Sequence, residues 1–263
     1  MLLQNRVIFL LHSIRGGSVR RIAATAFFAC VAIMAFAQQV GEYYHDVTLK
    51  EWNFDLFVNT GGVGAGFQHG RTPDLYNKHF WEIDFMYNQH PKSVRSVNSL
   101  YEGVRPCRYG QLYTLFFLRA GYGYQRTLHT KPYWGGVQIC YTLSAGFSAG
   151  FGIPNYVEVI NYNTGYSEIQ RYDPDEHNLN NIIGGAPLYT GILGTIVRPG
   201  FYAKTGFVFD FAKNDYKLQA LEVGLSVDMI FPFVQQMAYN KARKCYLAAY
   251  IAYDFGKKKG YHQ

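Results

Sequence analysis

The sequence predicts an all-β protein, an antiparallel up-and-down transmembrane β-barrel of about eight strands. Two features of the composition support this class: aromatic residues make up 17% of the 263 residues, and charged residues make up only 16%, against about 25% in an average soluble domain. The third observation is a period-two alternation of apolar and polar residues, repeated over segments longer than the roughly 5–6 residues of a typical soluble strand. A disordered chain would be poor in aromatic residues, and a helical bundle would be rich in Ala, Glu, Lys and Leu.

An apolar segment near the N-terminus, residues 22–37, has the features of a secretory signal peptide. It follows Arg20 and Arg21 and ends in the small-residue cleavage site Ala35-Phe36-Ala37. A membrane anchor is the competing interpretation, but the segment is shorter than the roughly 20 residues of a spanning helix. We therefore expect residues 1–37 to be a cleaved signal peptide with an overlong start.

The basic charge of the chain lies largely in this leader. The leader contains four Arg and no acidic residue, so its removal lowers the formal net charge from +7 to +3. The remaining chain gives no reason to expect a nucleic-acid partner. We expect residues 38–51 to form an N-terminal periplasmic segment, residues 52–256 an outer-membrane barrel, and residues 257–263 a basic C-terminal tail.

The first three predicted strands are Trp52–Gln68, Phe80–Asn88 and Leu112–Tyr124. The glycine-rich run Gly61–Gly66 resembles a phosphate-binding loop but fits a strand, where glycines allow bends and close packing. Phe80–Asn88 alternates aromatic and aliphatic residues with acids, and the third strand ends in two tyrosines. Aromatic residues at strand ends are typical of the interfacial girdles of membrane barrels.

The next three predicted strands are Tyr133–Gly150, Tyr156–Asn161 and Phe201–Phe211. The first and the third have aromatic and aliphatic residues on one face and mostly Gly, polar or charged residues on the other. Tyr156–Asn161 is the weakest of the eight assignments, and a barrel of ten strands is an alternative.

The last two predicted strands are Lys217–Phe231 and Cys245–Phe255. The segment from Leu221 to Phe231 shows the clearest alternation, and Phe255 closes the final strand in a way that resembles the C-terminal insertion signal of outer-membrane barrels. Bacterial single-chain barrels have an even number of strands. The sheet must close on itself because unpaired backbone groups are costly in hydrocarbon.

A soluble β-sandwich is the main alternative fold, because it also buries one face and exposes the other. The strand lengths, the aromatic girdles and a polar face rich in Gly, Ser and acids rather than Lys favour the membrane barrel.

Two predicted connections, Gln89–Gln111 and Tyr162–Pro199, are too long to be turns, and long ordered loops usually carry function. With eight strands and both barrel ends in the periplasm, Tyr162–Pro199 would be external and Gln89–Gln111 periplasmic. The short polar turn Lys213–Tyr216 is expected at the periplasmic end.

The face predicted to line the barrel interior is rich in acidic residues. A charge on the lipid face would cost roughly 2–4 kcal/mol at mid-depth, so these acids are expected to point inward. They form either a cation-preferring passage or an interior filled by side chains, and the small bore of an eight-stranded barrel favours the filled interior. The acids are Asp55, Glu82, Asp84, Glu158, Asp210, Glu222, Asp228 and Asp254, and the basic residues on the same face are Arg119 and Lys204.

The densest cluster of residues capable of acid–base or metal chemistry is Asp173, Asp175, Glu176 and His177. An Asp-Pro turn among solvated charges explains this cluster equally well. We therefore expect no enzyme activity, no catalytic or metal-binding residue and no cofactor.

Three cysteines remain after the leader, Cys107, Cys140 and Cys245. One disulfide could form among them, and the sequence does not indicate which pair.

Several short runs, spread over somewhat more than half of the chain, resemble a family of small outer-membrane β-barrel proteins of Bacteroidota. The resemblance implies an envelope role, alongside the type IX (Por) secretion machinery, and it supplies no catalytic residue. The runs are Leu118–Gly123, Lys131–Val137, Arg171–Pro174, Gly200–Lys204, Ala220–Gly224 and Met237–Lys241.

Three functional hypotheses follow. The first is a non-enzymatic barrel that serves as membrane anchor or accessory component of an envelope complex, with outer-membrane lipid and secretion subunits as partners. The second is a narrow cation-preferring channel. The third is a barrel hydrolase or lipid-modifying enzyme, which rests only on the cluster from Asp173 to His177.

Overall fold

The computed structural model describes residues 48–74, 76–98, 103–132, 135–161, 165–178, 181–213 and 216–260. The predicted signal peptide lies outside the described residues, as do Tyr133 of a predicted strand and Asn214 and Asp215 of the predicted turn. Within the described ranges, no helix has the length and apolar character needed to span a membrane.

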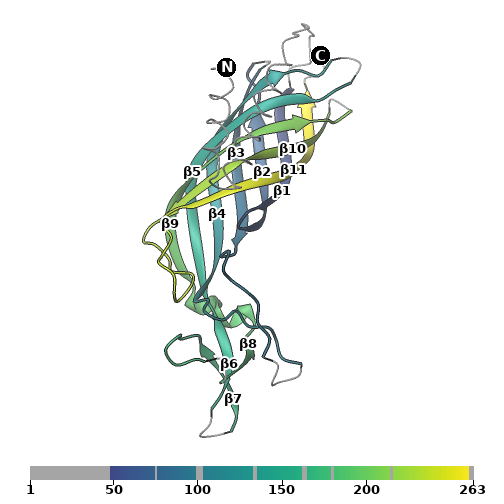
Figure 1. Cartoon of the computed structure of the whole chain (residues 1–263). Coiled ribbons are helices and arrows are strands. Elements are labelled where there is room, and N and C mark those ends of the chain that lie inside the picture. Colours follow the sequence, from purple (N-terminus) through teal and green to yellow (C-terminus); the bar gives the residue numbers. More distant parts are fainter. Residues whose placement is uncertain are drawn as a thin grey trace, which may run out of the picture. The chain divides into compact units, whose positions relative to one another are not determined.

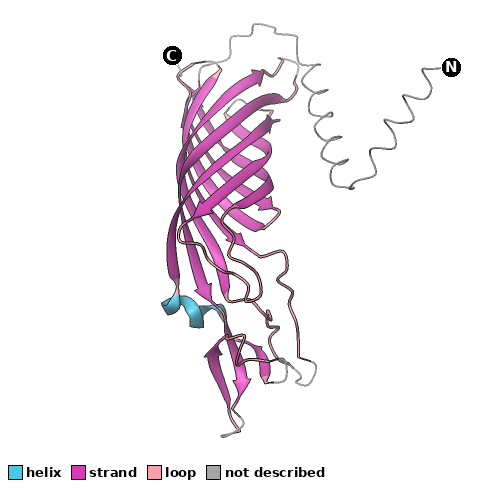
Figure 2. Cartoon of the chain, turned by 60° about the vertical axis from the view of Figure 1, so that its left-hand side comes forward, coloured by secondary structure: helices cyan, strands magenta, loops and turns pink. Residues whose placement is uncertain are grey.

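Eight antiparallel strands form one closed barrel (Figure 1 and Figure 2). Each strand pairs with the barrel strands before and after it in the chain, and β1 pairs with β11 to close the sheet. The predicted all-β, antiparallel up-and-down transmembrane barrel of eight strands is confirmed. The strands are β1 (Thr48–Asn59), β2 (Gly62–Arg71), β3 (Asn77–Asn88), β4 (Tyr113–His129), β5 (Gln138–Pro154), β9 (Ile196–Asp210), β10 (Lys217–Ile230) and β11 (Tyr246–Gly260).

A second, three-stranded sheet is inserted in the chain between β5 and β9. In this sheet β6 lies between β7 and β8, and a short 3-10 helix, η1, then leads into β9. The bounds are β6 (Tyr156–Ile160), β7 (Ser167–Arg171), β8 (Ile182–Gly185) and η1 (Leu188–Gly194).

The predicted barrel strand Tyr156–Asn161 therefore belongs to this separate sheet, and the prediction is wrong. Its alternation arises because Val157 and Val159 pack into a small apolar core of their own, with Tyr172 and Ile182. Alternation indicates that one face of a strand is buried, but not in which sheet it lies.

The predicted strand Trp52–Gln68 is two strands, β1 and β2, joined by a tight turn at Thr60 and Gly61. The turn is fixed locally, because the backbone N–H of Gly61 donates to Oδ1 of Asn59 at 2.8 Å. This error and the one at Tyr156–Asn161 cancel, so the predicted strand number is correct although two assignments are wrong.

The barrel is also longer at its ends than predicted. β1 begins at Thr48, so residues 48–51 belong to the barrel and not to the predicted periplasmic segment 38–51. β11 continues to Gly260, and its residue Lys257 pairs with Trp52 of β1. Most of the predicted basic tail 257–263 is therefore strand.

The two ends of the barrel differ in the length of their connections. The end that carries the start of β1 and the end of β11, here called the terminal end, has the connections 72–76, 130–137 and 211–216. The opposite end, the loop end, has the connections 60–61, 89–112, 155–195 and 231–245.

The two long predicted connections, Gln89–Gln111 and Tyr162–Pro199, thus leave the barrel at the same end. The prediction that they lie on opposite sides of the membrane is wrong. Each strand reverses the direction of the chain, so the one strand wrongly counted between them, Tyr156–Asn161, placed the two connections on opposite sides. The turn Lys213–Tyr216 lies at the terminal end. It was predicted to lie at the same end as both termini of the barrel, and it does.

Candidate functional site

The barrel interior is filled by side chains in three layers. The layer nearest the loop end is apolar, the middle layer is a network of charges, and the layer nearest the terminal end joins lysines to acids. The apolar layer consists of Phe57, Met86, Leu115, Phe117, Ile230, Val234, Tyr246, Tyr250 and Ala252.

A buried arginine crosses the middle layer. Arg119 of β4 donates from Nε and Nη2 to the carboxylate of Asp228 on β10, at 2.8 and 2.5 Å. Nη1 of the same guanidinium lies 4.0 Å from Oδ2 of Asp84 on β3. β4 and β10 are not neighbours in the sheet, so this two-point pair spans the lumen. Paired donors of this geometry form the stronger class of charged hydrogen bond.

A buried lysine holds the second half of the middle layer. Lys204 of β9 lies 3.3 Å from Oε2 of Glu82 and 3.4 Å from Oδ2 of Asp84, both on β3. Glu82 also accepts hydrogen bonds from Ser144 and Tyr202, at 2.6 and 2.7 Å. A buried charge is tolerated where opposite charges and hydrogen bonds satisfy it, and Glu82 has both.

The layer at the terminal end contains further ion pairs. Asp210 accepts from Nζ of Lys258 at 2.6 Å and from Nζ of Lys131 at 2.9 Å. Glu51 pairs with Lys78 and lies 3.7 Å from Nζ of Lys258.

Some acidic oxygens in the lumen have no partner among the described residues. They are both carboxylate oxygens of Asp55, Oδ1 of Asp84 and Oδ1 of Asp254. Asp55 faces Asp254 across β1 and β11, and a Cβ at Gly66 would collide with both Asp55 and Asp84. The glycine therefore makes room for two acids that converge from neighbouring strands. No group of three His, Cys, Asp or Glu in the described part of the chain has the arrangement of a metal site.

The barrel exterior is apolar. Outward side chains such as Phe147, Trp81 and Val58 are 71%, 65% and 62% exposed, whereas the charged residues of the middle layer are buried. A water-soluble monomer rarely exposes a continuous apolar surface larger than a few hundred Å². A closed sheet that is apolar outside and polar inside has the construction of an outer-membrane barrel, so this exterior is the lipid-facing surface.

The loop end carries a small folded head, defined by the sheet β7-β6-β8 and the segment 103–112. A hydrogen bond joins the head to the barrel: Arg171 of β7 donates to the hydroxyl of Tyr113, the first residue of β4, at 2.6 Å. Inside the head, the buried hydroxyl of Tyr172 accepts from the N–H of Gly110 at 3.1 Å. Burial raises the pKa of Tyr172 to about 12, so the hydroxyl stays neutral at physiological pH.

Comparison with solved structures gives only low similarity. Neisserial surface protein A (NspA) is 9% identical, with 81% of this chain and 96% of that chain covered and a TM-score of 0.34. Ail, the attachment invasion locus protein of Yersinia pestis, is 8% identical, with 80% and 95% covered and a TM-score of 0.33. No protein-family model and no curated protein matches the sequence. Sequence identities and TM-scores this low support no conclusion about function.

The predicted lumen residues are largely where the alternation placed them. Arg119, Lys204 and seven of the eight predicted acids are buried in the interior. Glu158 is the exception: it lies on β6, outside the barrel, because that strand was misassigned. Lys78 and Lys258 were missed, although Lys78 alternates with outward residues in β3 and could have been found from the strand pattern.

The cluster from Asp173 to His177 is a structural turn. Nδ1 of His177 accepts from the backbone N–H of Asp173 at 2.8 Å, Nε2 lies 3.2 Å from Oε1 of Gln170, and Oδ1 of Asp173 accepts from the N–H of Asp175 at 3.0 Å. Both ring nitrogens of this buried histidine are therefore engaged in holding the turn, so His177 is not free for acid–base chemistry.

The three cysteines of the described chain are free. Cys107 and Cys140 are buried and Cys245 is exposed. Cys107 belongs to the apolar core of the head, and Cys140 packs with Val208 and Ala220 inside the barrel.

Proposed function

We propose that this protein is a non-enzymatic outer-membrane barrel that anchors a docking head for another protein of the cell envelope. The head at the loop end is the observation that carries this proposal. The interior supports it as well, because an apolar layer and cross-lumen ion pairs occupy the space that transport would need.

The connections suggest an orientation. Outer-membrane barrels have short periplasmic turns and longer extracellular loops. By this rule the terminal end faces the periplasm and the head faces outward. A partner of the head is then expected at the outer face of the membrane or within the plane of the outer membrane.

The edges of the head's sheet indicate how a partner would bind. The edge of β8 is covered, because the N–H of Gly185 donates to the carbonyl of Arg105 at 3.0 Å and the side chain of Asn98 donates to the carbonyl of Ile182 at 2.7 Å. β7 pairs with β6 on one side, and in the described part of the chain no strand pairs with its other side. An open strand edge is a template for an added strand from another chain. An extended segment of a partner protein fits this edge.

The partner assembly is suggested by the family resemblance. The runs from Leu118 to Lys241 that resemble outer-membrane barrels of Bacteroidota make the type IX secretion machinery the assembly to test first. Export through the predicted signal peptide, residues 1–37, is part of the same proposal.

Ile169→Pro is expected to reduce docking by about tenfold or more, because proline removes an outward N–H and its ring obstructs an incoming strand. The N–H of Asn161 donates to the carbonyl of Tyr166 and the N–H of Tyr172 to the carbonyl of Asn155. In an antiparallel pair these bonds alternate, so Ile169 directs its backbone groups to the open edge and the proline leaves the pairing with β6 intact.

The measurement is quantitative co-purification from crosslinked native membranes. Ile169→Thr is the matched control, because it removes the same apolar side chain and keeps the N–H. Equal recovery of partners with the two variants would contradict docking through this edge, and a wild-type protein recovered without any partner would contradict docking altogether.

A narrow cation passage is the second candidate, and the carboxylate oxygens of Asp55 and Asp254 that have no hydrogen-bond partner among the described residues favour it. The docking proposal predicts that planar bilayers containing the protein show no stepwise conductance. Cation-selective steps that decrease in the double variant Asp55→Asn, Asp254→Asn would establish the channel instead.

A further inference from the structure

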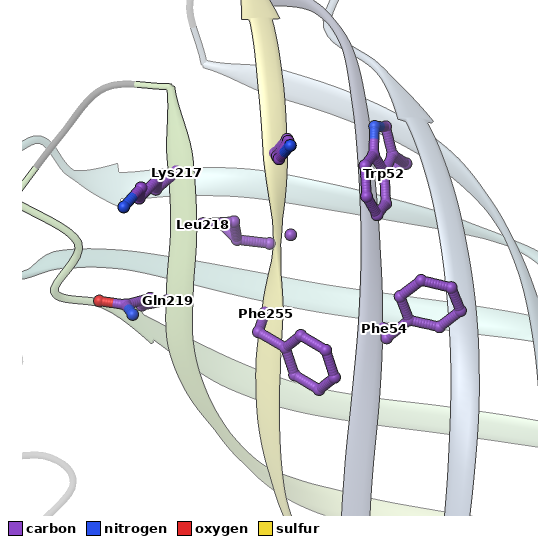
Figure 3. Close-up of a pocket in the computed structure, with 8 residues that line it drawn as sticks. Trp52, Phe54, Lys217, Leu218, Gln219 and Phe255 are labelled. Atoms are coloured by element: carbon purple, nitrogen blue, oxygen red, sulfur yellow. The ribbon is translucent and has the colours of Figure 1, made fainter.

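A groove lies on the outside of the barrel at its terminal end (Figure 3). It has a volume of about 300 Å³ and crosses β10, β11 and β1. The side chains that matter for its chemistry are Trp52, Phe54, Phe255, Gln219, Lys217 and Lys257.

The strand register orders these side chains by depth. Lys217, Lys257 and Trp52 are cross-strand neighbours in the row of the groove that lies nearest the barrel end. Gln219, Phe255 and Phe54 form the next outward row, and Leu221, Tyr253 and Leu56 form the third. The surface thus changes from cationic through aromatic to mainly aliphatic, in step with distance from the end of the barrel.

Both lysines are exposed and form no ion pair with the described residues. This distinguishes them from Lys258, which points inward and pairs with Glu51 and Asp210. Like charges directly opposite each other in a sheet are unfavourable, so the Lys217–Lys257 pair gains from an anion placed between the two ammonium groups. The rows below continue into the lipid-facing surface.

We propose that this groove binds the headgroup of an anionic phospholipid. The phosphate lies between Lys217 and Lys257, and the acyl chains lie over Phe255, Phe54 and the aliphatic row. Basic residues at a membrane surface attract anionic lipid, and aromatic side chains favour the headgroup level. The site is in the leaflet at the terminal end, and it does not depend on the docking function of the head.

The test uses the fluorescence of Trp52 in the full-length chain. The other two tryptophans are replaced (Trp81→Phe and Trp134→Phe), and the protein is placed in phosphatidylcholine nanodiscs that contain a minor fraction of either brominated phosphatidylglycerol or brominated phosphatidylcholine. Bromine quenches only nearby tryptophan, so the ratio of the two quenching efficiencies gives the enrichment of the anionic lipid beside Trp52.

We expect an enrichment of about fivefold or more, lost in the variant Lys217→Gln, Lys257→Gln. The matched control is Lys213→Gln, Lys259→Gln, which removes the same charge from exposed lysines at the same end of the barrel that do not line the groove. Folding of each variant is checked by its heat-dependent mobility on gels. Equal quenching by the two lipids would overturn the site, and equal loss in the control variant would replace it with a diffuse attraction of the basic barrel end.

Discussion

Replacing Arg119 with methionine is expected to destabilise the folded barrel by about 3–5 kcal/mol. The guanidinium is almost completely buried and makes a two-point pair with Asp228 across the lumen. Its loss leaves Asp228 as a buried charge without a partner, while Asp84 retains only Lys204. Removing one member of a buried pair costs more than the pair itself contributes, because the remaining charge is neither solvated nor neutralised.

Urea unfolding in liposomes, followed by the mobility of unheated samples on gels, measures this change. The double variant Arg119→Met, Asp228→Leu separates charge from packing, since it removes both members of the pair. It is expected to recover at least half of the lost stability. A single variant within about 1 kcal/mol of wild type would mean that water reaches Asp228 and that the lumen is not sealed.

The strand count shows what alternation can and cannot predict. Eight strands were obtained because the fused Trp52–Gln68 and the misassigned Tyr156–Asn161 compensated for each other. The turn at Thr60 and Gly61 did carry signals, because Asn59, Gly61 and Gly62 favour a turn and the outward positions change there from even to odd numbers, between Val58 and Val63. The fused assignment overlooked both. At Tyr156–Asn161 the pattern was real, but its apolar face is buried in the head.

The candidate site was predictable in part, because the alternation of a strand indicates which side chains point inward. Strand parity places a side chain inside or outside, which is why Glu82, Asp84 and Asp228 were expected in the lumen. Parity does not tell which strands face each other across the lumen. The pairs Arg119–Asp228 and Lys204–Glu82 could therefore be identified only from the structure of the closed barrel. Residues 257–259 were interpreted as a tail because a run of charged residues usually indicates a solvent-exposed segment. In the structure the strand continues through them to Gly260.

The head could not be predicted from local pattern. Its strands are only four or five residues long, and its core is assembled from segments far apart in the chain, including Cys107, Val157 and Ile182. Once β6 is removed from the barrel, the two long connections meet at one end. The docking proposal follows from this convergence rather than from any motif.

Phe147→Arg is expected to cost about 2–4 kcal/mol, because Phe147 lies near the middle of the 17-residue β5 on the lipid-facing surface. The side chain is 71% exposed and packs on Phe201, with ring centroids 5.4 Å apart. On a soluble protein, a substitution at such an exposed position would change stability by no more than about 0.5 kcal/mol. The sign and size of the effect therefore report whether lipid or water contacts this surface.

Tyr166→Arg is the matched control for exposure. Tyr166 is 76% exposed but lies in the head, beside β7 and outside the barrel, so the same arginine meets water there and should be nearly neutral. Urea unfolding in liposomes gives both values under one condition. Similar small effects at the two positions would mean that lipid does not cover the outward face of β5, and the membrane-spanning barrel would have to be abandoned. A large effect at Phe147 alone would separate, within one chain, the surface that contacts lipid from the surface available to a protein partner.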